Sequence, residues 1–196
     1  MIVQTSPSLS LPSTWSSLSQ LENFHYGDTG GAPPTRLTGS LPASWGTLTS
    51  LTHFEVYYAD TLSGPLPDAW NDMIQLISLT LVECNISGTL PESWSNMTHL
   101  AEVLVTNSQL TGTLPASWAA LNTIYSVNVT KNNLNRSLPM EWSNLMKQTL
   151  NVVDLSINRL SGSLPESWGG LSNLVILNLS SNALINSVPT TWSAIP

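Results

Sequence analysis

The sequence predicts an α/β solenoid, a fold in which one short segment recurs as successive coils around a shared core. The 196-residue chain has eight tryptophans, and each of them follows a proline by three residues. The prolines of successive pairs are 30, 25, 24, 24, 24, 26 and 24 residues apart. A recurrent period of this length is the sequence signature of a repeat architecture. The pairs are Pro12/Trp15, Pro42/Trp45, Pro67/Trp70, Pro91/Trp94, Pro115/Trp118, Pro139/Trp142, Pro165/Trp168 and Pro189/Trp192.

A second pattern fills the segments between these pairs. In the best-preserved turn, apolar Val103 and Val105 alternate with other residues, and Gly112 precedes Leu114 and Pro115. This order resembles the leucine-rich repeat. The 24-residue period with Gly-x-Leu-Pro resembles its plant-specific subclass. The variant Leu-Pro-x-x-Trp-Ser-x-Met/Leu resembles repeats of trypanosomatid surface antigens, of the promastigote surface antigen or proteophosphoglycan type. The resemblance implies a right-handed leucine-rich-repeat arc, with a parallel β-sheet on its concave face and 3₁₀ or irregular segments on its convex face.

The alternating residues predict one short strand in each turn, because successive side chains of a strand point to opposite faces. We expect the leucines and valines to point inward and the strands to pair in parallel, about 4.8 Å apart. Asn132, Asn158 and Asn182 share one position after the strands, where an amide can bond backbone groups of the adjacent turn. Cys84 takes the same position, and we interpret it as a weak structural donor rather than a nucleophile.

The Pro-x-x-Trp segment predicts a 3₁₀ helix on the opposite side of each coil, because residues three apart align there. Proline suits the first helical position, where its missing N–H is not needed. We expect each indole to enter the core and stack near that of the next turn, which removes roughly 150–250 Å² per ring from water. Exposed tryptophans that bind carbohydrate are the alternative, but a fixed register is typical of core aromatics.

The repeat extends over nearly the whole chain. We expect a single domain at residues 1–196 with about seven turns of 24 residues. A repeat array exposes hydrophobic surface at its ends unless capping units cover it. Neither end of the sequence contains a capping pattern, so the chain is interpreted as a fragment or as one whose ends a partner covers.

Composition excludes several classes of function. Charged residues make up only 9% of the chain and the net charge is −7, whereas 29 Ser and 20 Thr supply polarity. Five basic residues cannot form the cationic patch that nucleic acid requires. No apolar run is long enough to insert this segment in a membrane. One cysteine excludes an internal disulfide framework. No nucleophile elbow, phosphate loop or metalloprotease motif occurs, so we expect no enzyme and no cofactor.

The outward residues of the strands should form columns across the sheet. One column is predicted to contain His25, Glu55, Thr80, Leu104, Asn128, Asp154 and Asn178, and the next Asn23, His53, Ser78, Glu102, Ser126, Val152 and Ile176. The early turns therefore combine tyrosines with carboxylates, which suits a protein or peptide ligand with a basic or amide-rich segment. The candidate ligand-binding residues are His25, His53, Glu55, Tyr57, Tyr58, Glu83 and Glu102.

Three alternatives remain for this surface. It is an ordinary solvated face, a binding surface, or a metal site built from His25, His53, Glu55 and Asp28. Because two histidines without a fixed spacing are a weak signal, no metal is assigned. His99 is expected to face solvent away from the columns.

The favoured function is non-catalytic binding of a protein or peptide on the concave face, in part of a cell-surface or extracellular protein. That location follows from the resemblance, since the trypanosomatid family is surface-attached. A cytosolic interaction scaffold, a glycan recogniser and an enzyme inhibitor are the alternatives, and the oligomeric state is left open. Glycosylation sequons allow a secretory route, and Asn135 is the preferred acceptor because it is expected in a turn. The sequons begin at Asn85, Asn96, Asn128, Asn135 and Asn178.

Overall fold

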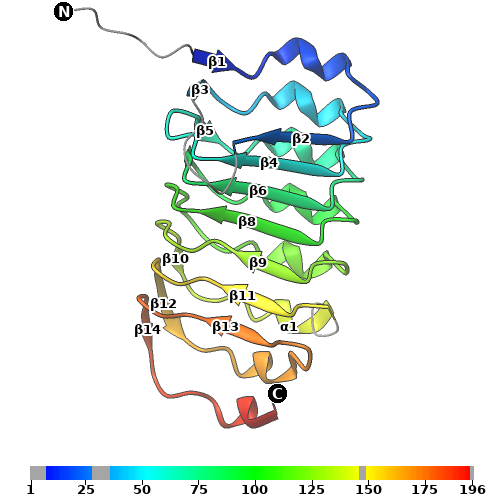
Figure 1. Ribbon diagram of the computed structural model, residues 1–196. Coiled ribbons are helices and arrows are strands. Elements are labelled where there is room, and N and C mark those ends of the chain that lie inside the picture. The colour runs from blue at the N-terminus through cyan, green and yellow to red at the C-terminus, as the bar shows by residue number, and fades with distance from the viewer. Residues whose placement is uncertain (1–7, 28–35, 146–148, 195–196) are drawn as a thin grey trace, which may run out of the picture.

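The computed structural model describes residues 8–27, 36–145 and 149–194, and they form the coils of a solenoid (Figure 1). One face is a seven-stranded parallel sheet with the order β13-β11-β9-β8-β6-β4-β2, so each coil pairs with its neighbours in the sequence. The fold class predicted from the repeat is confirmed. The strands are β2 (Asn23–Tyr26), β4 (His53–Tyr57), β6 (Ser78–Val82), β8 (Glu102–Thr106), β9 (Ser126–Asn128), β11 (Val152–Asp154) and β13 (Ile176–Asn178).

The register of the sheet matches the predicted columns. His25 lies opposite Glu55, and Glu55 lies opposite Thr80. The same column then continues through Leu104 and Asn128 to the last two strands. Residues between the columns, such as Val103 and Val105, are fully buried, because the alternation of a strand sends them into the core. The hydrophobic period therefore sets the pairing as well as the strands.

Short strands also line a side of the solenoid, and the repeat pattern does not predict them. They pair in three groups, β1-β3, β5-β7 and β10-β12-β14. Two of them contain glycine between small residues, as in Ser63-Gly64-Pro65 of β5 and Ser161-Gly162-Ser163 of β12. Their bounds are β1 (Ser8–Ser10), β3 (Arg36–Thr38), β5 (Ser63–Pro65), β7 (Asn85–Ser87), β10 (Asn135–Arg136), β12 (Arg159–Ser163) and β14 (Ala183–Ile185). Asn135 thus lies in a strand and not in the turn expected for it.

Helical segments follow the prolines of the Pro-x-x-Trp pairs, as expected. Among the described residues they are 3₁₀ helices, except for the four-residue α-helix α1 (Trp142–Leu145). No helix in the described ranges is long and apolar enough to cross a membrane. The 3₁₀ helices are η1 (Ser13–Ser17), η2 (Ala43–Thr47), η3 (Asp68–Asp72), η4 (Glu92–Asn96), η5 (Ala116–Ala120), η7 (Glu166–Gly170) and η8 (Thr190–Ala194).

The tryptophans occupy the core and stack between coils. Trp70 and Trp94 have ring centroids 6.4 Å apart and are nearly parallel, as are Trp142 and Trp168 at 6.0 Å. Phe54 is inserted edge-on between Trp45 and Trp70. The stacked core role is confirmed, since six indoles are completely buried: Trp45, Trp70, Trp94, Trp118, Trp142 and Trp168.

Each buried indole also has a hydrogen-bond partner in the preceding coil. The Nε1–H of Trp118 donates to the carbonyl oxygen of Pro91 at 2.9 Å, and that of Trp142 donates to Pro115 at 2.9 Å. The same bond recurs from Trp45 to Trp192. The proline nitrogen lacks a donor, but its carbonyl is an acceptor that the next tryptophan satisfies. The Pro-x-x-Trp pair therefore links every coil to the one before it.

A second ladder lies beneath the turn that follows the sheet. The side-chain amide of Asn132 donates to the Val105 carbonyl at 2.8 Å and its oxygen accepts the Leu110 N–H at 3.0 Å. Asn158 and Asn182 make the equivalent bonds. These amides satisfy backbone groups that would otherwise be buried without partners, as predicted.

Candidate functional site

The outward face of β2 and β4 brings a histidine and a carboxylate together. The Nδ1 atom of His25 lies 2.9 Å from Oε2 of Glu55, and the ring centroid of His25 lies 5.8 Å from that of Tyr57. These residues are adjacent because β2 and β4 pair in register. The pair is partly open to solvent, so its polar atoms remain accessible to a ligand.

Glu102 extends this cluster toward the middle of the sheet. Its Oε2 accepts a hydrogen bond from the Ser78 hydroxyl at 3.3 Å. Burial, helped by the negative charges of Glu55 and Glu102, raises the pKa of Tyr57, so this phenol stays protonated at neutral pH. Carboxylates and a protonated phenol thus share one face.

Tyr125 is a further member that the column analysis missed. Burial is the largest cause that raises the pKa of Tyr125, and the charge of Glu102 and a hydrogen bond with that side chain raise it further. Tyr125 precedes β9 by one residue, so it lies one position before the columns considered from the sequence. Extending the columns by one residue toward the start of each strand would have found it. We call the set His25, Glu55, Tyr57, Glu102 and Tyr125 the sheet patch.

Of the seven candidate residues, Tyr58 and Glu83 lie apart from this cluster. His53 lies on β4 opposite Ser78, which is in turn opposite Glu102, and its Nδ1 is 2.9 Å from the hydroxyl of Thr52. Tyr58 and Glu83 follow the last residues of β4 and β6 with φ of 56° and 55°. They therefore lie in the turns that follow these strands. The structure separates Tyr58 and Glu83 from the other five candidates.

The later coils use their polar side chains locally. Oδ1 of Asp154 accepts hydrogen bonds from the backbone N–H and the hydroxyl of Ser156. Its other oxygen lies 3.2 Å from Nδ2 of Asn178. Because these groups bond one another, the column beyond β9 offers fewer free partners than the early coils.

Metal binding and a reactive thiol are not indicated in the described part of the chain. No group of three or more metal-binding side chains gathers there, and Asp28 of the considered metal site lies outside it. Burial raises the pKa of Cys84 to about 12, and its thiol contacts the Val56 carbonyl at 3.9 Å. The interpretation of Cys84 as a structural donor is confirmed. His99 is exposed, as expected, with Nδ1 2.9 Å from the Ile74 carbonyl.

The comparison with protein families agrees with this geometry. The Leucine Rich Repeat model matches residues 75–97 and 149–171. The chain carries leucine-rich repeats. A search of curated proteins by sequence found no match.

Solved structures with similar coils include plant receptor ectodomains. The Arabidopsis receptor kinase HAESA, in complex with the peptide hormone IDA and a co-receptor, is 25% identical with a TM-score of 0.84, over 93% of this chain and 29% of that one. A TDR receptor is also 25% identical, with a TM-score of 0.83 over 94% and 30%. A plant ice-binding protein shares the fold, at 21% identity and a TM-score of 0.57 over 94% and 71%. The repeat protein thus spans under a third of the length of the two receptor chains.

Proposed function

We propose that this leucine-rich-repeat protein is a non-catalytic module that binds a peptide or protein through the outward face of β2, β4, β6 and β8. The observation that carries the proposal is the sheet patch, in which Glu55 and Tyr57 of β4 share one face with Glu102 of β8 and with Tyr125, which precedes β9. This face also includes His53 at the start of β4, and Tyr58 and Glu83 follow the last residues of β4 and β6. Together they form a larger surface than the patch alone.

The chemistry of the patch favours a cationic ligand segment. A lysine or arginine placed between Glu55 and Glu102 gains charge-assisted hydrogen bonds, and the tyrosine rings can contact its aliphatic stem and charge. Tyrosine is also enriched among residues that dominate binding energy. The net charge of −7 would steer a basic partner toward the molecule.

The compared structures support the same class of ligand. HAESA, part of which superposes on 93% of this chain, is described in complex with a peptide hormone. We therefore propose an extracellular or cell-surface setting for a single domain at residues 1–196. The trypanosomatid surface-antigen resemblance supports that setting through its Leu-Pro-x-x-Trp-Ser motif. Glycosylation at Asn135 belongs to the same proposal.

Selection from a displayed library of random heptapeptides tests this function. We expect lysine- or arginine-containing peptides to be enriched on the wild-type protein. The variant Glu55→Ala/Tyr57→Ala should bind a selected synthetic peptide at least tenfold more weakly in calorimetry, because it removes one carboxylate and one aromatic ring of the patch.

The matched control is Val152→Ala/Ile176→Ala, which changes outward residues of β11 and β13 on the same sheet. This variant should retain wild-type affinity for the peptide. Selected peptides that bind both variants equally would place the ligand elsewhere and refute the proposed site. Failure to enrich any basic sequence would refute the ligand chemistry.

A further inference from the structure

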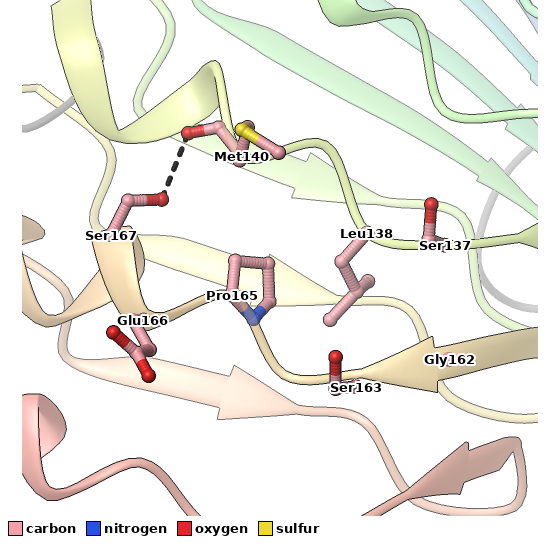
Figure 2. Close-up of a pocket in the computed structure, with 8 residues that line it drawn as sticks. All are labelled: Ser137, Leu138, Met140, Gly162, Ser163, Pro165, Glu166 and Ser167. Atoms are coloured by element: carbon pink, nitrogen blue, oxygen red, sulfur yellow. Dashed lines mark hydrogen bonds between the residues drawn. The ribbon is translucent and has the colours of Figure 1, made fainter.

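Two neighbouring cavities lie outside the seven-stranded sheet, where each side strand leads into a helical segment. The larger, of about 460 Å³, is lined by Leu138, Met140 and Pro165 with Ser137, Gly162, Ser163, Glu166 and Ser167 (Figure 2). The smaller, of about 280 Å³, is lined by residues one coil earlier, including Glu92, Arg136 and Glu141. Both cavities share Ser137, Leu138 and Met140 as their common wall. We call them together the helix-side groove.

The two cavities occupy equivalent positions of successive coils. Thr113, Leu114 and Ala116 line the first as Ser137, Leu138 and Met140 line the second, each 24 residues later. In the core beneath the groove, the ring centroids of Trp142 and Trp168 on adjacent coils are 6.0 Å apart, and we take this distance as the spacing of the coils. Alternate side chains of an extended peptide are about 6.6 Å apart. An extended segment that runs along the solenoid axis therefore presents one side chain to each cavity.

The lining distinguishes the two positions chemically. Leu138 and Pro165 form an apolar floor in the larger cavity, and Met140, 65% exposed, lies at its rim (Figure 2). The hydroxyl of Ser167 donates to the Met140 carbonyl at 3.0 Å, which joins the two walls (Figure 2). We expect an apolar side chain in this cavity, because it would cover the exposed Met140 side chain and remove its apolar surface from water.

Charge defines the second position. Glu92 and Glu141 line the smaller cavity with Arg136, and Glu166 lines the larger one. All four side chains belong to exposed residues, so the groove has a net negative charge at neutral pH. Exposed Thr113, Ser137 and Ser163 recur along its length and can bond the main chain of a bound segment.

We propose that the helix-side groove binds an extended peptide segment of a partner protein that carries an apolar residue and, two positions away, a lysine or arginine. The apolar residue occupies the cavity at Leu138 and Pro165, and the cation lies by Glu92 and Glu141. This site is separate from the sheet patch and does not depend on the function proposed for it.

The test uses three blocked pentapeptides and amide NMR titrations of the ¹⁵N-labelled protein. Ac-Ala-Leu-Ala-Lys-Ala-NH₂ has the required spacing, Ac-Ala-Leu-Lys-Ala-Ala-NH₂ has the same composition with the lysine moved by one, and Ac-Ala-Leu-Ala-Glu-Ala-NH₂ reverses the charge. We expect saturable shifts at Leu138, Met140 and Ser163 with the first peptide, and at least fivefold weaker binding of the other two.

Two variants locate the binding. Ser163→Trp fills the larger cavity and should abolish the shifts elsewhere in the groove, whereas Thr89→Trp, at the equivalent position of an earlier coil, should leave the affinity unchanged. Both positions are exposed, so both variants should keep the wild-type melting temperature. Glu55→Ala/Tyr57→Ala should also bind the peptide normally.

Several results would overturn the proposal. Absence of saturable shifts with the first peptide, equal affinity for the three peptides, or full binding by Ser163→Trp each excludes the groove as the site. Loss of binding in the Glu55→Ala/Tyr57→Ala variant would assign the peptide to the sheet patch instead, which refutes the groove while supporting the proposed function.

Discussion

Individual tryptophans carry two roles in this fold, as core residues and as donors to the preceding coil. Trp118 is completely buried, and its Nε1–H bonds the Pro91 carbonyl at 2.9 Å. Trp15 is only partly buried, although it stacks on Trp45 with centroids 5.9 Å apart. The same residue type therefore contributes differently at the edge and in the middle of the array.

The first prediction compares these two residues. Trp118→Ala should lower the free energy of unfolding by about 3–5 kcal/mol, because it removes a buried ring and leaves a cavity. Trp15→Ala should cost clearly less, about 1–2 kcal/mol, in proportion to its smaller burial. Urea denaturation of both variants measures the difference. Equal losses would contradict an indole column whose middle members are the better packed.

At the level of the element, the turn after each sheet strand is the most constrained segment. The residue before the position that Asn132, Asn158 and Asn182 occupy adopts a left-handed conformation in six successive coils, with φ between 52° and 56°. Asparagine adopts this conformation at little steric cost, as at Asn107, but a β-branched side chain is strained in it. Ile157 nevertheless adopts it with φ of 55° while being 46% exposed. Burial does not compensate for the strain at this position.

The second prediction follows from that strain. Ile157→Asn should raise the free energy of unfolding by up to about 1 kcal/mol, since it removes the steric cost and little packing. Thermal denaturation measures the change. Ile176→Asn is the matched control, because Ile176 is equally exposed but belongs to strand β13, and it should give no stabilisation. A stabilising control, or a destabilised Ile157→Asn, would refute the strain.

The sequence predicts the main-sheet strands and the 3₁₀ helices but not the side strands. Main-sheet strands and 3₁₀ helices followed from apolar alternation and from Pro-x-x-Trp, because local period decides which residues face the core. The side strands, such as β12, lack alternation of that kind and depend on pairing with an adjacent coil. Two of these strands contain glycine in the left-handed region, as at Gly162 of β12 with φ of 81°. The pattern of one segment cannot predict a strand that forms only by pairing with the adjacent coil.

For the whole molecule, stability is expected to depend on position along the axis. Each coil contacts only its neighbours, so an array behaves as a chain of nearest-neighbour interactions. Strand β8 pairs with β6 and β9, whereas in the described structure β13 pairs with β11 alone. The inward residue Leu177 of β13 is only partly buried, whereas its counterpart Val103 of β8 is completely buried, which indicates weaker packing at that end.

The third prediction concerns amide hydrogen exchange. The amides of Glu102 and Ile176 occupy equivalent positions and make equivalent hydrogen bonds, to the carbonyls of Ile77 and Asn151 at 3.0 Å each. We expect the Ile176 amide to exchange at least 100-fold faster, because local opening of the outer coil needs less free energy than opening of the middle. Identical protection of the two amides would show that the solenoid opens as one unit.

The amino-acid pattern alone determined the coil, its period, the strand register and the inward tryptophans, because each depends on which faces of a short segment are apolar. Tertiary structure decided the rest. It bonded the indoles from Trp45 to Trp192 to a proline of the preceding coil, added Tyr125 to the patch, separated Tyr58 and Glu83 from it, and formed the groove between Leu138 and Pro165. Those features depend on distances between coils about 24 residues apart in sequence, and a one-coil pattern contains no such distances.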